Sequence, residues 1–506
     1  MNDLAISLDG KSKTPLYEQI YSYIKHEIQT GGIKSGDKLP STRALCRYLE
    51  VSRSTVELAY EQLISEGYVE SEACRGFFAA DVEGLYQLER PMTAHPDGDG
   101  QKEDSFPYDF TPNGVDLNSF PYNAWRKLSR ESLLDDQAEL FRLGSPQGEY
   151  GLRSAICSYL HQARGVNCGP EQIIIGAGND YLLMLLATVI GQDHKVAFEN
   201  PTYRQAYRLF ENLSFRICTV DMDEKGMDAQ KLEESGADIA FVMPSHQYPL
   251  GIVMPIRRRM ELLRWAGKKD GRYIIEDDYD SEFRYKGKPI PALQGYDSRE
   301  KVIYIGTFSK AIAPAIRMSY LVMPRPLLKC YRERSGFLNS TVSKVDQLIL
   351  KKFIENGYFE RHLNKTRALY KSRHDTLLSC LKSRLCRIGG DARQRSCPGN
   401  ACKNGEPLFR ISGEHAGVHL LLHVLNGMTE EELIRRAQKR GVRVYGLSEY
   451  DVEPRPDAPA TILLGYANMS EEKIVEAVQI LEEEWIQLDC YSSRPNRPRT
   501  VTHPAH

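Results

Sequence analysis

The sequence predicts an α/β protein with a small helical domain in front of it. Val302–Pro324 (VIYIGTFSKAIAPAIRMSYLVMP) contains an apolar, buried type of strand followed by polar and basic residues. Arg272–Tyr285 (RYIIEDDYDSEFRY) contains an apolar strand that runs directly into three acids. Gln172–Leu186 (QIIIGAGNDYLLMLL) contains a strand, a glycine turn and an apolar helix. Because parallel sheets place their chemistry at the carboxyl ends of strands, these three stretches predict one site.

The overall composition limits the classes of protein. A chain of 506 residues with net charge −2 is long enough for several domains and is not a general polycation, so a nucleic-acid surface has to be local. Its 11 cysteines are scattered without metal-ligand spacing, which predicts a reduced, cytoplasmic protein without a metal site. No apolar run approaches the roughly 18 residues of a membrane helix, so we expect no membrane partner.

Residues 10–80 predict a winged helix-turn-helix. Thr14-Pro15 is a helix start, with the threonine as cap and the proline at the first helical position, and apolar residues then recur every four positions. A second helix is capped by Ser41, and a third begins at Ser52. Gly67–Val69 and Phe77–Ala79 are predicted strands, and the turn between them would form the wing.

The basic residues of this domain predict contacts with nucleic acid. Residues 34–53 hold five basic and two acidic side chains, a local charge of +3, although such a patch on an isolated helix is usually a solvated face. In a helix-turn-helix, the start of the third helix meets base edges and the preceding helix holds phosphates. We therefore expect Arg43 to contact phosphate and Arg53 to contact phosphate or a base. The full set of predicted contacts is Ser41, Arg43, Arg53, Ser54, Thr55 and Arg75.

Three segments have the composition of connections rather than of core. Residues 81–107 are polar, acidic and rich in Gly and Pro, which predicts a flexible linker. Residues 389–407 are predicted to be an insertion, whose Cys397 and Cys402 lack further ligands nearby and favour a reduced surface loop. Residues 489–506 are Pro-rich and are predicted to be a disordered tail.

Residues 108–488 are predicted to form the large α/β domain, with a large lobe over about 150–325 and a small lobe over about 326–488. In the large lobe, Val196–Phe198 and Asp238–Met243 are further strands. In the small lobe, strand-like Gly417–Val424, helix Glu430–Arg440 and strand-like Ile462–Gly465 predict an α+β arrangement.

The residues at the predicted strand ends suggest a specific chemistry. A lysine such as Lys310, placed after a buried strand, is a usable nucleophile for an aldehyde if burial lowers its pKa; alternatively its ammonium group lies in solvent. A carboxylate after the neighbouring strand would keep a pyridine nitrogen protonated, which is the tuning that pyridoxal 5′-phosphate (PLP) needs. The glycine turn before the helix at Asn179 would offer exposed amides to a phosphate.

The order of these motifs is similar to that of a known family. The runs IEDDYDSEFRY and GTFSKAIAPAIRMSYLV, together with LPSTRALCRYLEVSRSTVELAYEQLISEGYV, resemble the MocR family of bacterial regulators. That resemblance covers nearly the whole chain. It implies a GntR-type winged helix-turn-helix fused to a fold type I PLP-dependent transferase-like large domain, of the class I aminotransferase kind, with a smaller α+β lobe. It also implies a homodimer, because fold type I sites are commonly built at a two-fold interface.

The resemblance assigns roles to single residues. Lys310 would form the Schiff base with PLP, Asp277 would pair with the ring nitrogen, Tyr279 would lie near the ring oxygen, and Tyr203 would stack on the ring. The residues expected at the phosphate are Gly178, Asn179, Thr307, Ser309 and Arg317.

Two departures distinguish the chain from true aminotransferases. Tyr248 stands before Pro249 where those enzymes commonly have asparagine, which leaves open whether Tyr279 or His246 serves the ring oxygen. No arginine lies in ATILLGYANMS, where a carboxylate clamp is usual. Arg204 or Arg208 would be the alternative contact for an effector carboxylate.

These observations favour a PLP-dependent DNA-binding transcriptional regulator whose aminotransferase-like domain senses PLP or a PLP–amine adduct. Its partners would be operator DNA and a small amine or amino acid. In one alternative, PLP alone is the signal. In the other, the protein is a PLP-dependent aminotransferase with an accessory N-terminal helical domain; the missing clamp argues against steady turnover but leaves residual transaminase chemistry open.

Overall fold

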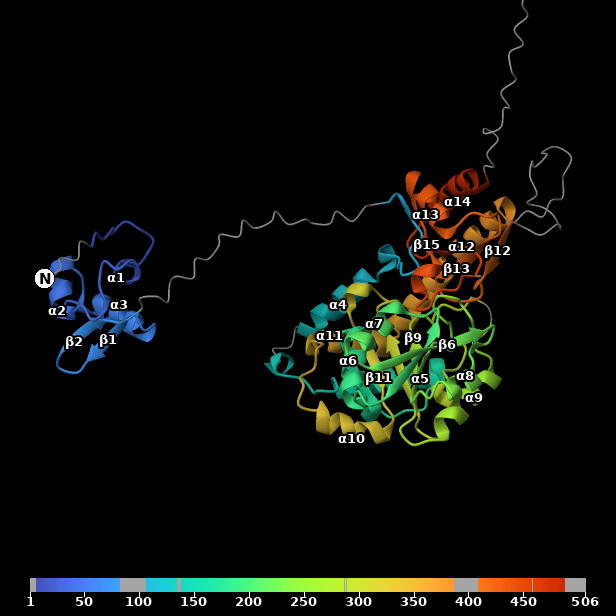
Figure 1. Ribbon diagram of the computed structural model, residues 1–506, viewed down its shortest axis with the longest axis horizontal. Helices are drawn as coiled ribbons and strands as arrows, with labels where there is room; N and C mark the ends of the chain where they lie inside the picture. The colour runs from blue at the N-terminus through green and yellow to red at the C-terminus, as the bar shows by residue number, and fades with distance from the viewer. Residues whose placement is uncertain are drawn as a thin grey trace, which may run out of the picture. The chain divides into compact units, whose positions relative to one another are not determined.

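The computed structural model describes residues 6–81, 106–133, 138–285, 287, 289–385, 408–456 and 458–486. The chain forms two compact units, Met1–Asp104 and Ser105–His506 (Figure 1). The predicted insertion and tail, and all of the predicted linker except its ends, lie outside the described residues, as do Cys397 and Cys402.

The first unit is a three-helix domain with a two-stranded sheet. The antiparallel pair of strands follows the third helix, and the buried side chains of all three helices share one apolar core. The predicted winged helix-turn-helix is thereby confirmed. Its elements are α1 (Leu16–Gln29), α2 (Thr42–Leu49), α3 (Arg53–Ser65), β1 (Val69–Glu72) and β2 (Gly76–Ala79).

The predicted Ser41 cap is present, and Ser52, where the third helix was predicted to begin, caps α3. Ser41 Oγ accepts a hydrogen bond from the Ala44 amide at 3.2 Å, and Ser52 Oγ accepts one from the Thr55 amide at 3.2 Å. The predicted Thr14 cap is wrong. Pro15 occupies the N-cap position of α1 with an extended backbone, and no side chain caps that helix.

The second unit is built on an eight-stranded sheet of order β4-β11-β10-β9-β8-β5-β6-β7. β10, β9, β8, β5 and β6 are parallel, whereas β11 is antiparallel to both β10 and β4. The Val302–Pro324 run therefore contains two strands, with Lys310 in the connection between them. The strands are β4 (Ile173–Gly176), β5 (Lys195–Asn200), β6 (Arg216–Asp223), β7 (Gly226–Met227), β8 (Ile239–Val242), β9 (Tyr273–Asp278), β10 (Val302–Thr307) and β11 (Ser319–Val322).

Helices cover both faces of this sheet (Figure 1). Side chains alternate along each strand, so Ile275 packs into the cluster that contains α6, while Ile274 packs into the cluster that contains α9. The helices of the large lobe are α4 (Tyr122–Leu133), α5 (Tyr150–Arg164), α6 (Asn179–Ile190), α7 (Arg204–Asn212), α8 (Ala229–Glu234), α9 (Ile256–Gly267), α10 (Arg325–Arg334) and α11 (Lys344–Glu355). The last two lie almost wholly beyond the predicted lobe boundary near residue 325, but their buried side chains pack in the apolar clusters of the large sheet. Short 3-10 helices are η1 (Leu117–Ser119), η2 (Ala138–Phe141), η3 (Pro170–Gln172), η4 (Gln294–Tyr296) and η5 (Pro314–Ile316).

The small lobe is an α+β layer, as predicted. Its sheet has the order β12-β13-β16-β15, and its helices share one apolar core with that sheet. Its elements are α12 (Tyr358–Arg384), β12 (Phe409–Ser412), β13 (His419–Val424), α13 (Glu430–Lys439), β14 (Val442–Arg443), β15 (Tyr445–Gly446), η6 (Leu447–Tyr450), β16 (Thr461–Gly465) and α14 (Glu471–Ile486), and β14 pairs with β3 (Tyr108–Asp109). Among the described residues, no helix combines the length and apolarity needed to cross a membrane.

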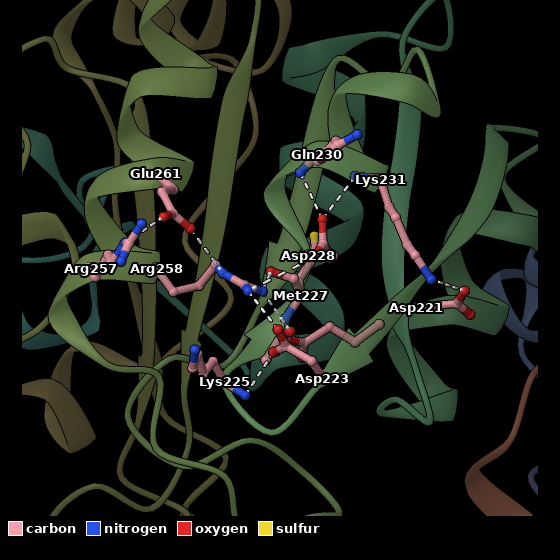
Figure 2. Close-up of polar contacts among 12 residues, drawn as sticks. Asp221, Asp223, Lys225, Met227, Asp228, Gln230, Lys231, Arg257, Arg258 and Glu261 are labelled. Carbon is pink, nitrogen blue, oxygen red and sulfur yellow. Dashed lines mark hydrogen bonds and ion pairs between the residues drawn. The ribbon is translucent and has the colours of Figure 1, made fainter.

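Arg258, a buried residue of α9, links this helix to the β6–β7 hairpin through hydrogen bonds. Arg258 donates to the carbonyls of Gly226 at 3.0 Å and Met227 at 2.6 Å, and to Asp223 Oδ2 at 2.7 Å (Figure 2). Asp228 then caps α8 by accepting from the Gln230 amide at 2.8 Å. Charge-assisted hydrogen bonds of this kind hold the edge of the sheet against its covering helices.

Candidate functional site

A pocket opens at the carboxyl edge of the large sheet, and the side chains around it come from segments far apart in the sequence. It contains every residue predicted for cofactor binding except Gly178. Five lining residues, Asn113, Asp180, Gln205, Met243 and Tyr248, were not predicted for cofactor binding from the sequence. The lining residues are Asn113, Asn179, Asp180, Tyr203, Gln205, Met243, Tyr248, Asp277, Tyr279, Thr307, Ser309, Lys310 and Arg317.

Lys310 is partly buried and is held by the segment that precedes the large lobe. Its Nζ donates to Asn113 Oδ1 at 3.1 Å and to the Pro112 carbonyl at 3.4 Å. Burial lowers the pKa of Lys310 to about 8. A substantial fraction of this amine is therefore neutral, and nucleophilic, near physiological pH. The alternative of an ordinary solvent-exposed lysine does not describe this environment.

Successive side chains of β9 face opposite sides of the sheet, so the three acids at its end do not all face the pocket. Glu276 accepts hydrogen bonds from the Leu293 and Gln294 amides at 2.7 and 2.8 Å, and Asp278 accepts one from Arg164 Nε at 2.9 Å. Asp277 points to the other face of the sheet, where it lines the pocket.

Asp277 is the least satisfied of these acids. It is 4% exposed, and it accepts a long hydrogen bond from Asn179 Nδ2 at 3.5 Å. Burial raises the pKa of Asp277 to about 7, with smaller contributions from the nearby Asp278 and Asp280 carboxylates. A cationic group bound in the pocket would form an ion pair with the buried Asp277 carboxylate.

Tyr279 and His246 lie one behind the other at the pocket wall. Tyr279 lines it, and burial raises the pKa of its hydroxyl. Tyr279 Oη lies 2.9 Å from His246 Nδ1, which lies 3.0 Å from Asp280 Oδ2. Of the two residues left open by the sequence, Tyr279 lines the pocket, while His246 contacts Tyr279.

The aromatic residues on the α7 side have different roles. Tyr203 lines the pocket at the N-cap of α7, and its ring lies 6.2 Å from that of Tyr248 in an edge-on arrangement. Tyr248, predicted to stand where aminotransferases commonly have asparagine, donates its hydroxyl proton to Tyr450 Oη at 2.9 Å. The Tyr248 hydroxyl therefore bonds to the small lobe.

The predicted phosphate residues line the pocket, except Gly178, which lies against Arg317. Thr307 Oγ1 accepts from the Ser309 amide at 3.1 Å. Arg317 has a left-handed backbone, with φ 47°, and its Nη2 pairs with Asp180 Oδ2 at 2.9 Å. A Cβ at Gly178 would come within 2.5 Å of Arg317 Nη2, so only glycine permits this approach.

The two arginines predicted for an effector lie beside the pocket. Arg204 donates to the Asp451 carbonyl. Arg208 is exposed and lines an adjoining hollow with Glu449 and Tyr450. This hollow and the main pocket share Asn113, Tyr203, Gln205 and Tyr248.

In the first unit, the predicted contact residues lie around the helix-turn-helix. Ser41 and Arg43 are exposed at the start of α2, and Arg53 and Ser54 are exposed at the start of α3. Arg53 Nε pairs with Glu57 at 2.7 Å but retains 59% side-chain exposure. Thr55 is only half-exposed, and its hydroxyl lies 2.7 Å from Ser52 Oγ.

The wing differs from a glycine-rich turn at one position. Cys74 has a left-handed backbone with φ 62°, a conformation that favours glycine. Arg75 is exposed, pairs with Glu72 and lies 5.6 Å from the centre of the Phe78 ring. Its guanidinium is therefore partly engaged within the wing itself.

Two family models match this chain, each over one unit. The model of bacterial regulatory proteins of the gntR family matches residues 16–79, and that of aminotransferases class I and II matches residues 113–481. The uncharacterized HTH-type transcriptional regulator YdeL of Bacillus subtilis is 40% identical over 96% of this chain and 99% of its own. The chain belongs to the MocR family.

Other relatives share this two-part organisation. The probable rhizopine catabolism regulatory protein MocR of Rhizobium meliloti is 29% identical over 96% of this chain and 97% of its own. The pyridoxine biosynthesis transcriptional regulator PdxR of Corynebacterium glutamicum is 32% identical over 88% of this chain and 91% of its own. This MocR-family protein is thus a DNA-binding transcriptional regulator with an aminotransferase-like domain.

Solved structures show the fold of that domain. Kynurenine aminotransferase of Pyrococcus horikoshii superposes with a TM-score of 0.64 at 24% identity, covering 76% of this chain and 92% of that enzyme. The α-aminoadipate aminotransferase LysN of Thermus thermophilus gives 0.62 at 22% identity, covering 75% and 92%. The fold type I class of the MocR-family domain is thereby confirmed.

Proposed function

We propose that this regulator holds PLP at Lys310 and that PLP, alone or combined with an amine, changes its affinity for operator DNA. The observation that supports this most strongly is the pairing of Lys310 and Asp277 in one pocket, each with its pKa moved toward neutrality by burial. Comparing operator binding by PLP-free and PLP-loaded protein tests the proposal.

The pocket fits PLP on three counts. Asp277 is a buried carboxyl that accepts, within the described part of the chain, only a long hydrogen bond, 3.5 Å, from Asn179 Nδ2, which leaves it suited to a protonated ring nitrogen. Asn179 Oδ1 is buried without a hydrogen-bond partner among the described residues. Gly178 and Arg317 form a tight cradle at the start of α6, where exposed amides favour an anion such as phosphate.

Each residue has a defined task in this proposal. PLP supplies an aldehyde that joins to a primary amine and a ring that withdraws electrons when protonated. Lys310 provides that amine, with Asn113 orienting its Nζ. Asp277 holds the ring proton, and Tyr279, supported by His246, donates to the ring oxygen. Tyr203 covers one face of the ring.

The remaining residues of the proposed site bind the phosphate group of PLP. Thr307 and Ser309 offer hydroxyl groups, and Arg317 offers a guanidinium fork once it exchanges Asp180 for the ligand. A half-exposed ion pair of this kind is weak, so the exchange costs little free energy.

An amine effector would enter through the hollow beside the pocket. Arg208 is exposed there and has no hydrogen-bond or ion-pair partner among the described residues. Arg204 is bonded to the Asp451 carbonyl, so Arg208 is the better candidate for an effector carboxylate. In β16, where aminotransferases place their clamp, the buried TILLG run offers no cation. This difference favours a regulator over an aminotransferase.

A second copy of the chain would cover exposed apolar surface next to the pocket. Leu117 and Tyr122 are 56% and 58% exposed, and they line a hollow with Ile316, the neighbour of Arg317. Exposed apolar patches of this kind are typical of protein interfaces. We therefore propose a homodimer, which binds its operator in the cytoplasm.

The homodimer gives a direct prediction. Purified protein should have a mass in solution of twice 57.6 kDa at micromolar concentration, and Tyr122→Asp should shift it toward the monomer because a charge would enter the apolar contact. Light scattering measures the mass. Tyr48→Asp, on the DNA-binding unit and 59% exposed, is the matched control. A monomeric wild-type protein would contradict the proposal.

Arg43 should contribute to operator affinity through phosphate. Arg43→Ala should weaken binding about equally on operator and unrelated DNA and reduce the salt slope by about one, because one counterion fewer is released. Fluorescence anisotropy across a salt series measures both quantities. Lys13→Ala, before α1, is the control. A loss confined to the operator would show that Arg43 recognises bases instead.

The rate of covalent PLP attachment should rise with pH. Burial lowers the pKa of Lys310 to about 8, so the neutral amine increases from a minority at pH 7 to a majority at pH 9. Stopped-flow absorbance on mixing PLP with PLP-free protein should show a midpoint near pH 8. A midpoint above pH 10, typical of a solvated lysine, would contradict the assigned environment.

A further inference from the structure

Three metal-ligating side chains converge at the end of α5, near the amino end of β4 and away from the cofactor pocket. They are Cys157, His161 and Cys168, and their ligand atoms all lie within 4.8 Å of one another. Both cysteines are buried, at 7% exposure each, whereas His161 faces solvent. No part of the proposed regulatory chemistry uses them.

Local structure accounts for this convergence. Cys157 and His161 are four residues apart, so they share one face of α5. Gly165 ends the helix with a left-handed backbone, φ 65°, and turns the chain back along it. Cys168 is thereby placed beside Cys157, whose Sγ donates to the Cys168 carbonyl at 3.2 Å.

We propose that Cys157 Sγ, Cys168 Sγ and His161 Nε2 bind a thiophilic divalent cation, Zn²⁺ being the physiological choice. With Zn–S near 2.3 Å and Zn–N near 2.0–2.1 Å, tetrahedral geometry separates sulfur from nitrogen by about 3.6 Å and sulfur from sulfur by about 3.8 Å. Cys157 Sγ already lies 3.8 Å from His161 Nε2. The Cys168 carbonyl oxygen, 2.8 Å from His161 Nε2 and 3.2 Å from Cys157 Sγ, has to move aside when the metal enters.

The charges of the site suit this cation. Glu171 lies close enough to both thiols to act on them electrostatically, and its negative charge attracts a cation. Binding replaces the two thiol protons, which pass to solvent, with one Zn²⁺, so the buried metal–dithiolate group carries no net charge. The neutral imidazole of His161 completes three protein ligands.

The alternative to a metal site is that the two buried cysteines pack as small apolar residues. In the present arrangement His161 Nε2 lies 2.8 Å from the Cys168 carbonyl, which satisfies the ring without a metal. Binding of Co²⁺ through sulfur distinguishes the two possibilities, because a metal site shows it and a pair of cysteines that only pack does not.

The test is titration of reduced, chelator-treated, PLP-free full-length protein with Co²⁺, followed by Zn²⁺. We expect one equivalent of Co²⁺ per chain to produce a thiolate-to-cobalt charge-transfer absorbance, which Zn²⁺ then abolishes. Cys168→Ser should remove the band. His161→Gln changes only an exposed side chain and should weaken binding at least about tenfold, since even residues behind the ligands contribute that much.

Cys218→Ser provides the matched control. Cys218 is half-buried in β6 and is not part of the cluster, so this variant should keep the band and the affinity of the wild type. Absence of the band in the wild-type protein would overturn the proposal. A band of unchanged strength and affinity in both His161→Gln and Cys168→Ser would also overturn it, because other cysteines would then bind the metal.

Discussion

Replacing Lys310 with alanine is expected to abolish covalent attachment of PLP. The wild-type protein, reduced with borohydride after mixing with PLP, should gain the mass of one reduced cofactor on the peptide that contains Lys310, and the variant should gain none. PLP affinity should fall by at least about a hundredfold, or about 2.7 kcal/mol, because only non-covalent contacts remain. Mass spectrometry and equilibrium dialysis measure the two effects.

The matched control is Lys329→Ala. Lys329 lies on α10 and is 83% exposed, so its removal should change neither the mass gain nor the affinity. Lys310→Ala should still bind DNA in the PLP-free state, since the helix-turn-helix forms a separate compact unit. Equal labelling of wild type and Lys310→Ala would show that PLP attaches elsewhere.

Replacing Asp277 with asparagine is expected to weaken PLP binding by about 10- to 100-fold. The amide has the shape of the carboxyl but cannot balance a protonated ring nitrogen, and a charge-assisted hydrogen bond contributes about 1.5–3 kcal/mol. The measurement is a PLP titration at pH 7.5, followed by absorbance. Asn is preferable to Ala here because it leaves no cavity.

Stability provides a separate check on the Asp277 variant. Burial raises the pKa of Asp277 from its ordinary 3.8 to about 7, so its unfavourable ionisation reduces the stability of the PLP-free protein progressively as pH rises through that window. Asp277→Asn should therefore stabilise PLP-free protein, and more at pH 8 than at pH 5. A variant that binds PLP normally, or that is destabilised at pH 8, would contradict this assignment.

Much of the pocket could be predicted from the sequence because its residues follow strands. Lys310 comes after β10, Asp277 ends β9, and Asn179 opens α6 after β4, so a parallel sheet brings them to one edge. The choice of Asp277 among three acids came from family resemblance, and period-two alternation along β9 gives the same answer.

Other parts depend on contacts that no local pattern contains. Asn113 lies 197 residues before Lys310 and follows no predicted strand. The sequence left open whether Tyr279 or His246 serves the ring oxygen, because only the fold shows that Tyr279 lines the pocket and that His246 lies behind it. Cys168 meets Cys157 and His161 through the turn at Gly165, and a spacing of ten residues between the cysteines matches no common metal motif.

The central claim is that cofactor state controls DNA binding. The measurement that tests it most directly is the affinity of purified protein for DNA from upstream of its own gene, at fixed salt, in PLP-free and PLP-loaded forms and then with added amines. We predict a change in affinity that Lys310→Ala removes. A change with PLP alone would identify PLP as the signal, and a change that requires an amine would identify an amine sensor. Operator affinity that is the same in every state would contradict the account.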